Sequence, residues 1–251
     1  MNKTLLYPIG SSDSCRWASA FLEKAGFPLT DHPSPEITHL LLDIPSFNAN
    51  HMLPDGSDLT QLLRMLPKTI TVIGGNLDQD ALSDYRKTDL LKDPDFLAQN
   101  AAITAECALR IAAPHLSTTF SNAPALILGW GRIGKCLAKL LSAMGSHVAV
   151  AARKSSDRAM LRALGYDAVD FSQIPQILTH YRILFNTVPE LPLLINLDSW
   201  KNGVAFDLAS LPGMKGAQVI AARGLPGKYA PESSGKLICE TILRMQKEET
   251  L

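Results

Sequence analysis

The sequence predicts an α/β protein in which a doubly wound parallel sheet follows a smaller N-terminal α/β domain. Three observations lead to this fold class. Short apolar runs alternate with amphipathic helical segments along the chain, which is typical of parallel β-α-β units. Residues 114–124 (PHLSTTFSNAP) are rich in turn-forming residues and separate two such series. Directly after them, a glycine-rich turn joins a short apolar strand to a helix. We therefore expect one domain over residues 1–118 and a second over residues 119–251.

The first domain contains three short apolar runs bounded by Pro, Gly and polar residues, each of which predicts a strand. These runs are residues 4–9, 39–43 and 69–73. Helices are expected at residues 14–25, which end before Gly26, and at residues 59–65. A further helix over residues 104–113, with Thr104 as its N-cap, is expected to lead into the second domain.

The second domain reads as a longer series of the same kind. Strands are predicted at residues 125–128, 147–152, 183–186, 204–208 and 219–222. Apolar residues recur on one face of the helix that follows the first of these strands, at the spacing of an α-helix. That helix stops at Gly145. A last helix is predicted from Pro231 to about Lys247, and it could dock back on the first domain.

Charge excludes one class of partner and favours another. The chain has 24 Lys and Arg and 24 Asp and Glu, so its formal net charge is zero. A protein that holds nucleic acid or a membrane surface by bulk electrostatics is therefore not expected. Residues 1–123 hold nine cations and fourteen anions, whereas residues 124–251 hold fifteen and ten, so the halves carry −5 and +5. The cationic half is suited to small anions.

Targeting and metal signals are missing from the sequence. The four cysteines are widely spaced and form no C-x-x-C pair, which argues against a disulfide framework or a zinc site. They are Cys15, Cys107, Cys136 and Cys239. No apolar run reaches the ~18 residues of a membrane span, and residues 1–14 lack the apolar core of a signal peptide. We expect a cytoplasmic protein without a metal site.

The glycine-rich turn is the strongest chemical signal. Gly129, Gly131 and Gly134 form a G-x-G-x-x-G pattern between a predicted strand and a predicted helix. In a Rossmann-type fold the first glycine permits the tight turn, the second lets a pyrophosphate approach, and the third allows close helix–strand packing. The helix N-terminus then offers free N–H groups to the phosphates. Residues 129–134 are therefore predicted to bind a dinucleotide, with Trp130, Arg132 and Ile133 between the glycines; an ordinary glycine-rich turn is the alternative.

The end of the next strand distinguishes the two nicotinamide cofactors. An acidic residue there usually binds the ribose of NAD, whereas an arginine accommodates the 2′-phosphate of NADP. This chain has Arg153, Lys154 and Ser155 at that point and no acid. A guanidinium binds phosphate in bidentate fashion. NADP(H) is therefore the predicted cofactor, and a solvated loop is the alternative.

Polar or glycine-rich loops also follow the later strands. Asn186, Thr187, Val188 and Pro189 end one strand, and Asp207 ends the next. Ligands of doubly wound sheets bind at the carboxyl ends of the strands. We therefore predict that these residues line the cofactor cleft, although each loop alone could be a simple turn.

Several motifs together resemble one family. LGWGRIG, AARKSS, FNTVP, FDLASLPG and ARGLPGKYAPESSG look like the A subunits of dipicolinate synthase, an enzyme of bacterial sporulation. The resemblance runs from about residue 100 to residue 244. It implies an NADP-linked oxidation of dihydrodipicolinate, a small dicarboxylate, together with a flavoprotein-like B subunit. A homo-oligomer is also expected. Residues 1–99 are similar in layout only.

The resemblance also implies substrate residues. Asn100, Thr104 and Glu106 fall where the family has Asn, Thr and Glu. Further substrate candidates lie in the last loop, where a dicarboxylate would need cations and N–H donors: Arg223, Gly224, Leu225, Pro226, Gly227 and Lys228. Glu106 and Lys236 are candidates for a catalytic role. Ordinary surface charges explain the cations equally well, and Glu106 could instead complement its helix dipole.

Two other functions remain open from sequence. Dehydrogenases of 2-hydroxy acids share the layout but use a catalytic histidine near the end of the chain, and the last of the six histidines here is His180. A shikimate dehydrogenase-like enzyme has a similar size and NADP loop, but the Asn-Val-Thr-x-Pro-x-Lys signature is missing. The first open function is therefore another NADP-dependent dehydrogenase of a small carboxylate. The second is a subunit that binds the cofactor but catalyses no reaction of its own.

Overall fold

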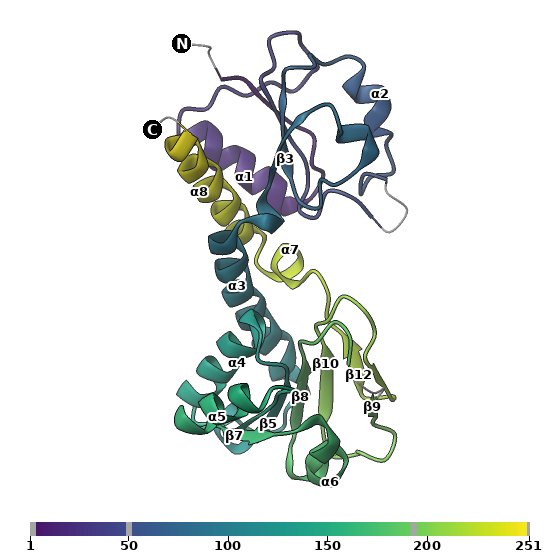
Figure 1. Ribbon diagram of the computed structural model, residues 1–251, viewed down its shortest axis with the longest axis vertical. Coiled ribbons are helices and arrows are strands. Elements are labelled where there is room, and N and C mark those ends of the chain that lie inside the picture. The colour runs from purple at the N-terminus through teal and green to yellow at the C-terminus, as the bar shows by residue number, and fades with distance from the viewer. Residues whose placement is uncertain (1–3, 49–51, 192–194, 250–251) are drawn as a thin grey trace. The chain divides into compact units, whose positions relative to one another are not determined.

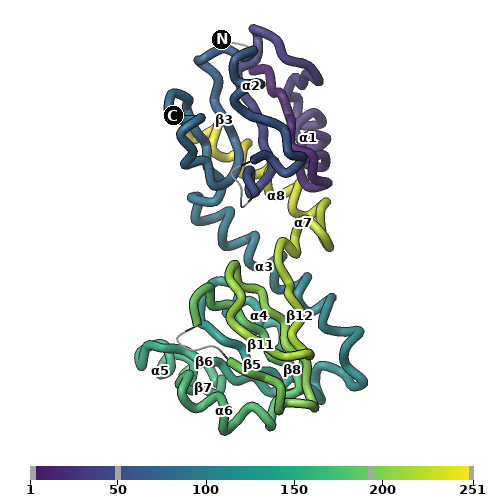
Figure 2. Tube along the Cα trace, turned by 90° about the vertical axis from the view of Figure 1, so that its right-hand side faces the viewer, coloured from purple at the N-terminus to yellow at the C-terminus, as the bar shows by residue number. Residues whose placement is uncertain are grey.

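The computed structural model describes residues 4–48, 52–191 and 195–249 and confirms a two-part parallel α/β fold. Unit 1 comprises Met1–Asn100 and Pro226–Leu251, and unit 2 comprises Ala101–Leu225 (Figures 1 and 2). This division departs from the boundary expected at residue 118. The C-terminal segment belongs with the N-terminal unit because its helix α8 (Pro231–Glu249) packs along α1 (Asp13–Lys24).

Unit 1 is built on a four-stranded parallel sheet in the order β1-β2-β3-β4. The strands are β1 (Leu6–Pro8), β2 (His39–Leu41), β3 (Thr71–Gly74) and β4 (Arg86–Asp89). Helix α2 (Leu59–Leu63) packs in a leucine-rich core that also includes Leu40 of β2 and Val72 of β3. Strand β4 was not predicted, because its sequence RKTD is polar and only its pairing with β3 makes it a strand.

Helix α3 (Pro94–Ala112) begins ten residues before the predicted start at Thr104. The Asp93 carboxylate accepts a hydrogen bond of 2.7 Å from the backbone N–H of Phe96, and Pro94 occupies the first helical turn. Aspartate before a proline is a strong N-terminal signal. Thr104 as an N-cap is therefore wrong; this residue lies buried in the middle of the helix.

Unit 2 is a six-stranded parallel sheet in the order β12-β10-β8-β5-β6-β7, which is the doubly wound order of a Rossmann fold. Its strands are β5 (Ala125–Leu128), β6 (Val148–Ala151), β7 (Asp167–Val169), β8 (Ile183–Asn186), β10 (Val204–Asp207) and β12 (Val219–Ala221). Unit 2 contains most of α3 together with α4 (Arg132–Ala143), α5 (Ser155–Ala163) and α6 (Ile174–Ile177), and α7 (Leu225–Tyr229) follows it in the chain. Strands β9 (Ile195–Asn196) and β11 (Met214–Lys215) form a separate pair. The central strands are buried on both faces, which explains their continuous apolar sequences.

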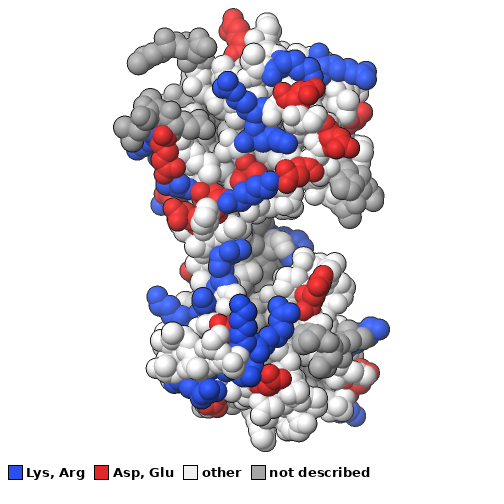
Figure 3. Space-filling model, in the orientation of Figure 1, with Lys and Arg blue, Asp and Glu red and all other residues white. Residues whose placement is uncertain are grey.

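Charge is distributed between the two units as it is between the two halves of the sequence. Unit 2 holds twelve Lys and Arg against seven Asp and Glu, so it carries +5 and unit 1 carries −5. Figure 3 shows Lys and Arg side chains gathered on the visible face of unit 2, in the lower part of the picture. Unit 2 is therefore the part of the chain suited to anionic ligands.

A glycine allows α8 to pack closely on α1 within unit 1. A Cβ atom at Gly235 would lie 2.7 Å from the carbonyl oxygen of Ser14 and 2.8 Å from the amide nitrogen of Ala18. Arg244 of the same helix binds the Asp93 carboxylate at 2.7 Å. Helix α8 is therefore held near its start by backbone proximity and near its end by an ion pair.

We predict that Gly235→Ala destabilises unit 1 by about 1–3 kcal/mol, because the added methyl group forces the two backbones apart. Thermal unfolding followed by circular dichroism measures this change. Gly227→Ala is the matched control, since a Cβ there meets only the Ser14 hydroxyl at 3.6 Å. An unchanged unfolding midpoint for Gly235→Ala would contradict the close packing.

Candidate functional site

The turn after β5 depends on two glycines at which a side chain would collide with its surroundings. Gly129 has φ +103°, and a Cβ atom there would lie 2.7 Å from the Thr187 hydroxyl and from a methyl group of Val188. A Cβ at Gly134 would collide with the Gly129 carbonyl oxygen. Two of the three predicted glycine roles, the tight turn and the close helix packing, are therefore visible in the geometry.

Gly131 is the residue predicted to let a pyrophosphate approach, and the space around it is compatible with that prediction. It precedes α4 as the N-cap residue, no side chain caps the helix there, and a Cβ at this position would meet nothing within 4 Å. Its backbone angles (φ −82°, ψ −169°) are ordinary extended values, so a side chain here would project into open space. The first N–H groups of α4 and the space beside Gly131 are what a pyrophosphate requires.

The next two strand ends are joined by a buried hydrogen-bonded pair. The Asn186 side-chain amide donates to the Asp207 carboxylate at 2.8 Å, and the two residues are 0% and 3% exposed. Asp207 also accepts from the backbone N–H of Gly213 at 3.0 Å, and Asn186 accepts from that of Val188. Both were predicted to line the cofactor cleft. In the structure they hold the loops together, and the residues beside the glycine turn are Thr187 and Val188.

Thr187 links that loop to the strand before the glycine turn. Its hydroxyl donates to the carbonyl oxygen of Leu128 at 2.8 Å, and its backbone N–H donates to the same oxygen at 3.0 Å. Pro189 is exposed beyond this contact. The glycine turn and residues 186–188 consequently form one connected edge of the sheet.

The loop after β6 is exposed and cationic. Arg153, Lys154 and Ser155 are all exposed, and Ser155 begins α5. Sequence reasoning missed Arg158, which lies beneath this loop. Its guanidinium donates to the carbonyl oxygens of Ala152 and Arg153, both at 2.7 Å, and contacts the Asp170 carboxylate at 2.8 Å.

Asp170 is suited to pair with the Arg158 guanidinium, because its carboxyl group is held in the charged form. Hydrogen bonds from the Ser172 amide and hydroxyl, with the charge of Arg158, lower the pKa of the Asp170 carboxyl. The carboxylate therefore stays charged beside the arginine. The only sequence signal for Arg158 was its place five residues after Arg153. Its contact with Asp170 joins residues twelve positions apart and could not be read from the local sequence.

The aromatic residue of the turn packs on its own unit. The Trp130 ring lies 5.9 Å from that of Tyr166, and the Lys135 ammonium lies 5.7 Å above the Trp130 ring. Arg132 is exposed and Ile133 half-buried at the start of α4.

The predicted substrate residues are divided between the two units. In unit 2, Thr104 is buried in α3, Glu106 is exposed on it, and Arg223 donates from Nε to the Ala209 carbonyl oxygen at 2.9 Å. Gly224 has φ +64° and precedes the buried Leu225.

The remaining candidates belong to unit 1. They are Asn100, Pro226, Gly227, Lys228 and Lys236. Lys236 lies 3.8 Å from Glu240 on its own helix, which is the contact of an ordinary surface ion pair. Its catalytic role stays a prediction, as does that of Glu106.

Unit 1 has a β-α turn of the same kind as the glycine turn, but its own side chain fills it. The backbone N–H groups of Ser11 and Ser12 donate to the buried Asp43 carboxylate at 2.9 and 3.1 Å, and both hydroxyls also bind it. Burial and the nearby Asp43 charge raise the pKa of the Cys15 thiol to about 12. The Asp43 carboxylate therefore takes up the N–H groups that a phosphate would need, and Cys15 stays an uncharged thiol.

Three comparisons place the chain among known proteins. Residues 111–197 match the family model of the D-isomer specific 2-hydroxyacid dehydrogenase NAD binding domain. The A subunit of dipicolinate synthase from Bacillus subtilis (strain 168) is 26% identical over 169 residues, which cover 63% of this chain and 57% of that relative. The alignment therefore spans little more than half the length of this curated relative. The resemblance to dipicolinate synthase A subunits is confirmed.

Solved structures agree on the fold. The crystal structure of the dipicolinate synthase A subunit from Bacillus halodurans gives a TM-score of 0.80 at 21% identity, covering 97% of this chain and 98% of that one. A transhydrogenase from Sinorhizobium meliloti gives 0.70 at 17% identity, covering 90% and 79%. These structures share the fold of this chain, and the family match places an NAD binding domain of the same type at residues 111–197.

Membrane spans and metal clusters are both missing from the described part of the chain. None of its helices is both long and apolar enough to span a bilayer. Within the same residues, no three His, Cys, Asp or Glu side chains gather as potential metal ligands.

We predict that Gly131→Val leaves the fold intact and weakens NADPH binding at least about a hundredfold, because the side chain occupies the space of the pyrophosphate. Fluorescence titration measures the affinity, and thermal unfolding checks the fold. Gly134→Ala is the contrasting variant, and it should lower the unfolding midpoint. Retained affinity in Gly131→Val would mean that the turn does not bind a dinucleotide.

Proposed function

We propose that the chain is an NADP-linked oxidoreductase of the dipicolinate synthase A type, which oxidises dihydrodipicolinate to dipicolinate. The observation that carries the proposal is the open glycine turn at Gly131, on a chain whose motifs match a dipicolinate synthase A subunit. We further propose that it acts in the cytoplasm, as a homo-oligomer and together with a flavoprotein-like B subunit.

The loop after β6 supports NADP over NAD. Arg153 and Lys154 follow the strand where an NAD site would place an acid, and Arg158 binds two carbonyl oxygens of the same loop. The Arg153 guanidinium and the Ser155 hydroxyl would hold the 2′-phosphate of NADP(H). Arg158 and Asp170 fix the backbone that carries them.

The reaction makes modest demands on acid–base groups. A bound NADP⁺ would supply the hydride acceptor, and the dihydropyridine ring would lose that hydride and release one proton to water as it becomes aromatic. Because aromaticity favours this loss, the main task of the chain is to position the donor carbon. The Asn186–Asp207 pair fixes the two loops at the proposed nicotinamide end. Arg223 of unit 2 is proposed to bind a substrate carboxylate.

We predict that Arg153→Asp weakens NADPH binding about a hundredfold, because a carboxylate would repel the 2′-phosphate, while NADH affinity changes less than about threefold. Parallel titrations with the two cofactors measure the difference. Arg162→Asp makes the same charge change at the other end of α5, where little effect on either cofactor is expected. Equal losses for NADPH and NADH in Arg153→Asp would rule out the NADP assignment.

Turnover separates the three proposed functions. Purified chain supplied with dihydrodipicolinate and NADP⁺ should produce dipicolinate, followed through NADPH absorbance, and Gly131→Val should not. Oxidation of another small carboxylate in its place would indicate a different dehydrogenase. A chain that binds NADPH yet oxidises nothing until a partner flavoprotein is added would be a cofactor-binding subunit.

A further inference from the structure

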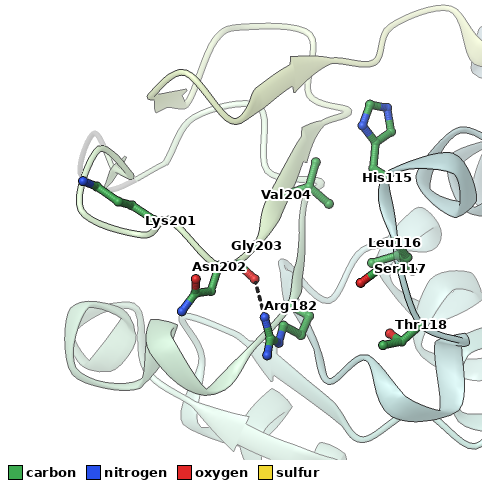
Figure 4. A pocket seen from close by; sticks show the side chains of 9 residues that line it. All are labelled: His115, Leu116, Ser117, Thr118, Arg182, Lys201, Asn202, Gly203 and Val204. Atoms are coloured by element: carbon green, nitrogen blue, oxygen red, sulfur yellow. Dashed lines mark hydrogen bonds between the residues drawn. The ribbon is translucent and has the colours of Figure 1, made fainter.

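A cavity in unit 2 lies at the sheet edge opposite the glycine turn. Strands β8 and β10 are paired in register, from Ile183 and Val204 at one edge to Asn186 and Asp207 at the other. The cavity is lined at the first edge by residues 115–118, 182 and 201–204, and its volume is about 430 Å³ (Figure 4). That volume is within the range of pockets that hold small molecules. The proposed cofactor residues lie at the opposite, carboxyl edge.

The lining is cationic and has no acid. Arg182, Lys201 and His115 contribute nitrogen groups, and none of the lining residues is Asp or Glu. Among the described residues, neither Arg182 nor Lys201 forms an ion pair. An arginine at a strand start with no carboxylate partner leaves its positive charge available to a ligand.

A hydrogen bond orients the exposed Arg182 side chain in the lining of the cavity. One guanidinium nitrogen, Nη1, donates to the carbonyl oxygen of Asn202 at 3.1 Å. This bond orients the planar group and leaves its other N–H groups for a ligand. Figure 4 shows Arg182 between the loop that carries Asn202 and the loop that carries Ser117 and Thr118, with the Lys201 side chain extending away at the rim.

Hydroxyl groups and an imidazole occupy the other side. Ser117 and Thr118 are exposed, and Figure 4 shows them across the cavity from Arg182. The ring of His115 is steadied by an edge-on contact with Phe206, at 5.7 Å between centroids. Planar guanidinium, hydroxyl and imidazole N–H donors are the groups that bind phosphate oxygens.

We propose that this cavity is a second anion site, which binds the phosphate group of a small organic phosphate independently of the dinucleotide. Arg182 supplies two N–H donors, and Ser117 and Thr118 supply hydroxyl donors. The proposal does not depend on the reaction at the carboxyl edge, because the two sets of residues are separate.

Histidine NMR provides a direct test with the full-length chain and inorganic phosphate. His115→Gln assigns the ring signal of this residue among the six histidines. Phosphate should shift the His115 signal saturably in the wild-type chain. Arg182→Gln should weaken this binding at least about tenfold, the effect of removing a charge-assisted hydrogen-bonding group. Arg162→Gln removes an arginine of the same unit outside the cavity and should leave binding unchanged.

Two further variants keep the test decisive. Ser117→Ala with Thr118→Val removes both hydroxyls and should weaken phosphate binding roughly threefold or more, even if Arg182→Gln fails to fold. Gly131→Val should retain the His115 response, since it alters only the proposed dinucleotide site. No saturable shift in the wild-type chain, or an equal response in Arg182→Gln and Arg162→Gln, would overturn the proposal. So would loss of the response in Gly131→Val.

Discussion

The contact between Gly134 and the carbonyl oxygen of Gly129 is the constraint on which the proposed cofactor site depends. Because no side chain separates them, α4 begins directly against the end of β5. That position leaves the space beside Gly131 open and lets Thr187 reach back to the Leu128 carbonyl oxygen. The buried Asn186–Asp207 pair then extends the same edge across the neighbouring strands. A single close backbone approach thus determines the arrangement of three loops.

The two units show how one topology can be open or closed to anions. Both place a short polar turn between a first strand and a first helix. In unit 1 the Asp43 carboxylate binds the N–H groups of Ser11 and Ser12, so the chain supplies its own anion. In unit 2 the corresponding turn at Gly131 has no such internal partner among the described side chains. The opposite net charges of the units agree with this difference.

The sequence was most informative where a local rule decides the structure. Continuous apolar runs located the central strands of unit 2, and the glycine spacing located the turn, because both patterns depend on neighbouring residues. The polar strand β4 and the short strand β7 depend on pairing with a neighbour and could not be found this way. Arg158 was missed because its partner Asp170 lies beyond the next strand. The early start of α3 could have been predicted from Asp93 and Pro94, a local signal that the apolar pattern near Thr104 obscured.

The discontinuous sequence of unit 1 has a consequence for the order of synthesis. Its sheet and α1 are encoded in the first hundred residues, but α8, which covers α1, is made only after all of unit 2. Domains fold as they leave the ribosome, so unit 2, whose chain is continuous, can complete its fold first. Unit 1 therefore keeps one face of α1 uncovered until α8, which follows unit 2 in the chain, has been made.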